Sequence, residues 1–163
     1  DSEHLAEPAP NAVSPLNHSS AICYLDLDTH KVLFTGDAGV QSLNAAIDFG
    51  LSRNIDVRNC TRIQVPHHGS KRNVGPKLLD RLLGPRVPYG TVIDKKGLIS
   101  AAKDGEPKHP SARVTNAFLR RGVPTTANKG QTVCYASPNV PVRSGWSPVE
   151  NIPFRESYSE DDD

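Results

Sequence analysis

Four side chains that could bind a metal ion fall within three short motifs of the sequence. The motif TGD contains Asp37, PHHGS contains His67 and His68, and KHPS contains His109. A carboxylate combined with neutral imidazoles is a ligand set suited to zinc, manganese or iron. Such an ion lowers the pKa of bound water from 15.7 to about 7, which makes hydroxide available at neutral pH. The pattern therefore favours metal-assisted hydrolysis.

Each motif also has a structural interpretation. A Gly-Asp pair after a strand is commonly a turn, and a histidine before proline at a helix start is commonly a cap or a surface residue. The adjacent histidines are less easily explained in this way. Gly36 and Gly69 remove a Cβ beside Asp37 and His68, which permits sharp turns and close approach of a ligand. Together, in this order, the motifs indicate a site more strongly than any one of them does.

A different chemistry would make Ser70 a nucleophile activated by His67 or His68. No G-x-S-x-G elbow surrounds Ser70. Neighbouring residues on one strand point to opposite sides, so only one of the two histidines could face the site. Substitution of one histidine should then be much more damaging than substitution of the other.

Alternating strands and helices must position these residues. Apolar patterns predict a β-hairpin over residues 21–37, a helix over 39–53, a strand over 61–66 and a helix over 75–84. They also predict one or two strands over 90–102, a helix over 109–122 and a last strand over 131–137. The fold class is therefore α/β with a layered arrangement. Loops that follow the strands gather at one edge of such a sheet, where the three motifs can meet.

The length and composition indicate one packed domain with irregular ends. Residues 19–137 form the packed region, residues 1–18 an extended arm or linker remnant, and residues 138–163 an irregular Pro-rich and acidic tail. The net charge of +1 provides no overall field to attract a polyanion. No run of about 18 apolar residues exists, so no membrane span is expected.

The three cysteines, Cys23, Cys60 and Cys134, form no C-x-x-C pair. They are expected to be buried free thiols in a reducing compartment, taken here as the cytoplasm. The chain contains no methionine and begins at Asp1, which we interpret as the mark of a mature, trimmed or cleaved piece.

Three stretches resemble metallo-β-lactamase-fold hydrolases, in particular the hydrolase domain of the DNA-uptake competence proteins. They are NHSSAICYLDLDTHKVLFTGDAG, RIQVPHHGS and LISAAKDGEPKHPSARVTNAFLRRG, and the resemblance runs from Asn17 to about Tyr135. The resemblance implies an αβ/βα sandwich of two sheets with one or two divalent metal ions, zinc or manganese favoured, at the edge between its halves.

The resemblance also implies roles for individual residues. Asp37 takes the place of the aspartate that bridges two metal ions. His67 or His68 becomes a nearby ligand or orients the substrate, and His109 becomes a late histidine of the site. Asn17 and Ser20 match an N-x-x-S element, and substrate phosphate is assigned to three further residues, Ser70, Lys71 and Lys108.

The N-terminal metal motif of that family, H-x-H-x-D-H, is missing from this sequence. The chain therefore resembles only the C-terminal half of the domain, and we expect a partner: the complementary N-terminal half or another chain. The function expected is a phosphodiesterase or nuclease that is complete only with that half, acting on nucleic acid or a nucleotide. The alternative is a regulatory or interaction module that keeps the fold without metals.

Overall fold

The computed structural model describes residues 3–27, 29–103, 109–136, 140–141 and 143–158. A single five-stranded sheet has the order β1-β2-β3-β4-β5. β1 is antiparallel to β2, and β2 to β5 run parallel. The expected mixture of helices and strands is confirmed, since helices flank this mixed sheet. Its strands are β1 (Cys23–Leu27), β2 (His30–Phe34), β3 (Arg62–Gln64), β4 (Lys96–Ile99) and β5 (Thr125–Ala127).

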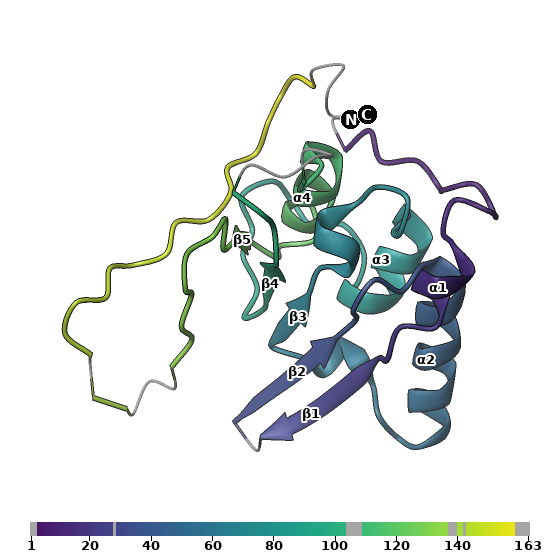
Figure 1. Ribbon diagram of the computed structural model, residues 1–163, viewed down its shortest axis with the longest axis horizontal. Helices are drawn as coiled ribbons and strands as arrows, with labels where there is room; N and C mark the ends of the chain where they lie inside the picture. Colours follow the sequence, from purple (N-terminus) through teal and green to yellow (C-terminus); the bar gives the residue numbers. More distant parts are fainter. Residues whose placement is uncertain (1–2, 28, 104–108, 137–139, 142, 159–163) are drawn as a thin grey trace.

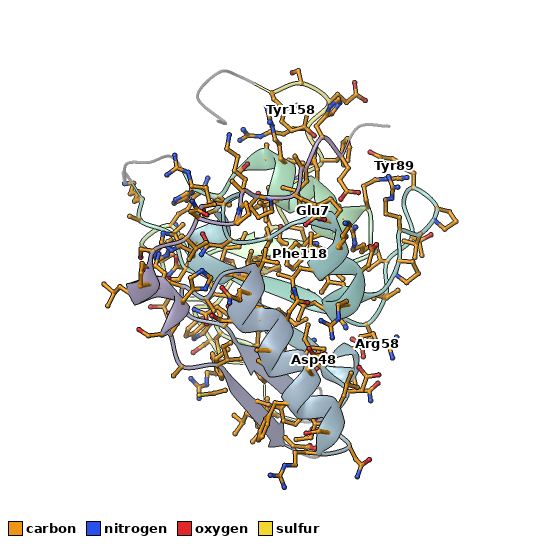
Figure 2. The ribbon with its side chains drawn as sticks, turned by 90° about the vertical axis from the view of Figure 1, so that its right-hand side faces the viewer. Glu7, Asp48, Arg58, Tyr89, Phe118 and Tyr158 are labelled. Carbon is orange, nitrogen blue, oxygen red and sulfur yellow. The ribbon has the colours of Figure 1, made fainter. Side chains whose placement is uncertain are left out.

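The helices pack on one face of the sheet. Figure 1 shows α2, α3 and α4 on the same side of the strands, and in Figure 2 they stand in front of the sheet. No helix in the described part of the chain has the length and apolarity that a membrane crossing requires. The helical elements are α1 (Pro15–His18), α2 (Val40–Ser52), α3 (Pro76–Leu83), α4 (Ala112–Leu119), and the 3-10 turns η1 (Val57–Asn59) and η2 (Pro66–Gly69).

The helix spacing of the sequence explains why one face of each helix is buried. α3 begins with Pro76 in its first turn and ends at Gly84, whose positive φ of 101° suits glycine. Its four leucines are buried, and so are Phe118 of α4 and Ile63 of β3. Phe118 lies near the centre of the molecule in Figure 2. Burial of these side chains against the sheet supplies the main stabilisation, at roughly 25 cal/mol per Å² of apolar area.

The opposite face of the sheet carries no helix among the described residues. Register places side chains on this face in rows, one with Val32, Arg62 and Lys96 and the next with Gln64, Leu98 and Thr126. Three large apolar side chains of β1 and β2 on this face are 43–52% exposed: Leu25, Leu27 and Phe34. We call this surface the open face.

The strand expected over residues 131–137 does not form over 131–136, the part of it that the structure describes, so this prediction is wrong. The last strand is instead β5, because Thr125 and Thr126 pair directly with Gly97 and Leu98 of β4. The segment around Tyr135 lines a groove on the open face. The expectation of buried cysteines holds only for Cys60, since Cys23 and Cys134 are exposed.

The N-terminal arm packs on the body. Glu3 and Leu5 are buried, and Glu7 accepts a hydrogen bond of 2.8 Å from the N–H of Lys77 at the start of α3. The ring of Tyr158 lies 5.3 Å from that of His4, edge to face. Both ends of the described chain therefore meet beside α3 and α4.

Candidate metal centre

The candidate ligands follow neighbouring parallel strands. Asp37 comes three residues after the end of β2, and His67 and His68 lie in η2 directly beyond β3. Because β2 and β3 are parallel, their carboxyl ends lie at the same edge of the sheet. A hydrogen bond of 3.0 Å from the N–H of His67 to the carbonyl of Gly36 joins the two loops.

The two histidines do not continue the strand, and the expectation that only one of them could face the site is wrong. Both have left-handed backbone angles, with φ of 44° at His67 and 57° at His68. This conformation cancels the alternation of a strand, so both rings lie on one side. Such a conformation costs roughly 1–3 kcal/mol per non-glycine residue and occurs preferentially at functional sites.

A close contact of Gly69 brings His109 to the pair. A Cβ at Gly69 would lie 2.5 Å from the Cβ of Pro110, so only glycine permits this approach. The N–H of Ser111 donates to the carbonyl of Gly69 at 3.1 Å. The ring centroid of His109 is consequently 6.1 Å from that of His67 and 6.3 Å from that of His68, and the pair itself is 5.5 Å apart.

A backbone carbonyl determines the tautomer of His68. The Nδ1 of His68 is hydrogen-bonded to the carbonyl oxygen of Ser100, which can only accept. Nδ1 therefore carries the proton, and the lone pair is on Nε2. This is the arrangement found in metal-binding histidines, where the second ring nitrogen donates to an outer partner.

His67 lies between a carboxylate and an amide. Its Nδ1 is 3.7 Å from Oδ2 of Asp37 and 3.0 Å from Nδ2 of Asn17. Asn17 belongs to α1, which Ser14 caps through a 3.3 Å hydrogen bond from the N–H of Asn17. The N-terminal arm thus contributes directly to the candidate site.

Polar side chains hold the turn that carries Asp37. The N–H of Asp37 donates to Oγ of Ser20 at 3.2 Å, and Nδ2 of Asn73 donates to the carbonyl of Asp37 at 2.8 Å. Oε1 of Gln64 accepts from the N–H groups of Thr35 and Gly36 at 3.0 and 3.1 Å. Sequence reasoning named Ser20 but missed Gln64 and Asn73. Their only sequence signal was a polar residue beside a motif.

Burial lowers the pKa of His109, and the nearby His67 and His68 lower it further. A lowered pKa favours the neutral imidazole, which is the state that binds a metal ion. The carboxylate of Asp37 stays 42% exposed, so the cluster is open to solvent on that side.

The residue types of the cluster are those that bind metal ions, but the ligand atoms are not arranged around one point. Three imidazoles on one zinc ion, with Zn–N distances of about 2.0–2.1 Å, place their ring centroids roughly 5 Å apart. The observed separations of 5.5–6.3 Å are slightly wider. Within the residues that the structure describes, no group of three or more His, Cys, Asp or Glu side chains is poised to hold a metal.

No family model, curated protein or solved structure matches this chain. The geometry of the candidate metal centre therefore carries the functional argument, together with the resemblance in the motifs.

The residues assigned to substrate phosphate lie in different surroundings. Ser70 is 5% exposed, and its Oγ accepts from the N–H of Arg72 at 3.3 Å, which is a role in the turn. Lys71 follows it and is partly exposed. Lys108 lies outside the described residues.

Proposed function

We propose that the chain forms one wall of a metal-dependent hydrolase with a phosphodiesterase or nuclease activity. The observation that carries the proposal is the meeting of Asp37, His67, His68 and His109 at the carboxyl edge of parallel strands. Three imidazoles this close are seldom needed for stability, and the left-handed backbone at two of them is costly.

Individual residues of the candidate site would have different roles in this activity. His68 offers Nε2 as a ligand because Ser100 holds the proton on Nδ1, and Asp37 offers an exposed carboxylate. Asn17 orients His67 through Nδ1, the ring nitrogen that also lies nearest to Asp37. A bound zinc or manganese ion would supply hydroxide at neutral pH and polarise a phosphoryl oxygen. The choice of a phosphodiester in nucleic acid or a nucleotide rests on the resemblance.

The open face supports the proposal of a partner. Leu25, Leu27 and Phe34 remain 43–52% exposed on a sheet whose other face is covered by helices. The part of the sheet from β2 to β5 is parallel, and parallel sheets are normally covered on both faces. We propose that the complementary half, which would bring the missing ligands, packs a second layer against β1 and β2. Sedimentation of the chain with and without its co-purifying protein tests this: a lone, stable monomer with no associated chain contradicts it.

Zinc titration of the metal-free chain, alone and with its partner, tests the proposed metal centre. Asp37→Ala should weaken zinc binding at least about 100-fold, because even loss of an outer-shell partner costs roughly 10–100-fold. Asp26→Ala is a matched control, since the Asp26 side chain is 48% exposed and lies on β1. Binding of less than about half an equivalent of zinc or manganese by the assembly would contradict the hydrolase and favour the interaction module.

A further inference from the structure

A groove of about 440 Å³ opens beside the candidate metal centre. It lies on the open face at the carboxyl end of the strands, between the sheet and the segment around Tyr135. Its volume is within the roughly 300–1,000 Å³ of small-molecule sites. Ser100 lines the groove and also accepts the hydrogen bond from His68, so one residue separates the groove from the histidine cluster.

Two aromatic rings and an aliphatic floor provide the apolar part of the groove. Phe34 is 44% exposed at the end of β2, and Tyr135 stands opposite the sheet. The hydroxyl of Tyr135 is hydrogen-bonded to Thr126 of β5, and the Arg62 guanidinium lies 5.6 Å from its ring centroid. These contacts hold the Tyr135 ring in place beside Leu98. A planar ligand could therefore stack without first ordering the site.

Three side-chain amides contribute to the polar part, from Gln64, Asn128 and Gln131, and backbone groups determine how the first two are oriented. Oε1 of Gln64 accepts from the N–H groups of Thr35 and Gly36, and Oδ1 of Asn128 accepts from the N–H of Ala101 at 2.9 Å. An amide oxygen that accepts from N–H groups leaves its NH₂ group as the donor on the other side. Neither NH₂ group has an acceptor among the described residues.

None of the described residues that line the groove carries a charge. The groove therefore matches a flat, uncharged ring with hydrogen-bond acceptors. Aromatic side chains stack on any base, and amides recognise base edges. We propose that this groove binds a nucleobase of the substrate, with Gln64 and Asn128 donating to its acceptors. The role of the groove as part of a substrate site rests on the proposed function. The adjoining histidine cluster would then act on the phosphate linked to the bound base.

The test is titration of the metal-free 163-residue chain with thymidine, followed by NMR of the amide groups of Gln64 and Asn128. Saturable binding that shifts these signals is expected, whereas deoxyribose 5-phosphate, which lacks the base, should leave them unchanged. Thymidine carries no phosphate and the sample no metal. Failure here therefore leaves the hydrolase proposal standing, and a failed zinc titration leaves the groove proposal standing.

Variants of the two amides make the test specific. Gln64→Glu and Asn128→Asp keep the oxygens that accept from the backbone and lose the NH₂ donors, so each should weaken thymidine binding about tenfold or more. Gln41→Glu makes the same change at an exposed residue of α2 that does not line the groove, and it should leave the affinity unchanged. Tyr135→Leu should also weaken binding about tenfold or more through lost stacking.

The proposal is overturned if thymidine and uridine both fail to bind saturably, or if binding is unaffected by Gln64→Glu and Asn128→Asp. Titration with a short single-stranded oligonucleotide of thymidine distinguishes nucleic acid from a free nucleotide as the source of the base. Tighter binding of the strand than of thymidine indicates nucleic acid, and equal binding indicates a free nucleotide. Thermal unfolding of each variant verifies that the fold is retained.

Discussion

At the scale of single residues, the conformation of His67 and His68 is the least expected feature of the site. Both residues occupy the left-handed region with φ of 44° and 57°. The sequence drew attention to these histidines by their chemistry and by their place after a strand. It did not show that both rings share one side, because alternation would have separated them. The tautomer of His68 is also a tertiary property, since Ser100 lies 32 residues away.

Comparison of two substitutions at His68 measures the backbone strain at this position. His68→Gly should be more stable than His68→Ala by about 1 kcal/mol, because glycine adopts a φ of 57° without a steric cost and alanine does not. Both substitutions remove the same ring, so loss of its hydrogen bond to Ser100 cancels in the comparison. Urea unfolding at neutral pH provides the measurement. Equal stability of the two variants would show that the left-handed conformation carries no strain.

At the scale of elements, the periodic segments were predicted well. The hairpin, the strand β3 and the three longer helices all occur within the expected ranges. These segments have local signals: apolar spacing, Pro76 at a helix start and Gly84 after its end. β5 was missed because its three residues follow Gly122 with no alternation to mark them, whereas pairing with β4 makes them a strand.

The close approach of η2 to the segment around Pro110 is possible because Gly69 has no Cβ. Gly69→Ala should destabilise the chain by about 2–4 kcal/mol, because the new Cβ meets Pro110 at 2.5 Å and φ is 86°. The contact also holds the loop of His109 against η2, so zinc binding should weaken in parallel.

Gly84→Ala is the control for this substitution. Its φ of 101° and ψ of 174° lie in a region almost restricted to glycine, but nothing lies within 4 Å of the added Cβ, so only the conformational cost of about 1–3 kcal/mol applies. Equal losses in the two alanine variants, measured by chemical denaturation, would show that the approach of Gly69 to Pro110 is unimportant.

At the scale of the whole molecule, a buried ion pair ties the N-terminal arm to the body. Arg121 is 1% exposed and donates to Glu3 at 2.9 Å and to Asp80 at 2.9 Å. The same arm ends in α1, which brings Asn17 to His67. The arm expected over residues 1–18 is extended over much of its length, and it is also part of the packed structure and of the candidate site.

Glu3→Gln should destabilise the chain by about 3 kcal/mol. Removal of one partner from a buried pair costs about 3–5 kcal/mol, and Asp80, which stays with Arg121, favours the low end of that range. Asp56→Asn removes a partner from the solvent-exposed pair with Arg58 and should have a much smaller effect, because water screens exposed ion pairs. Thermal unfolding of the two variants decides this, and similar small losses would mean that the arm contributes little.

The sequence by itself determined the α/β class, most of the element order and the chemical types at the candidate site, because these depend on local spacing and residue type. The tertiary structure decided that both histidines of the pair and His109 converge. It also decided that Gln64 and Asn128 present their NH₂ groups to one groove, and that one sheet face stays open. These properties arise from contacts between segments far apart in the chain and from backbone conformations that ordinary alternation does not predict.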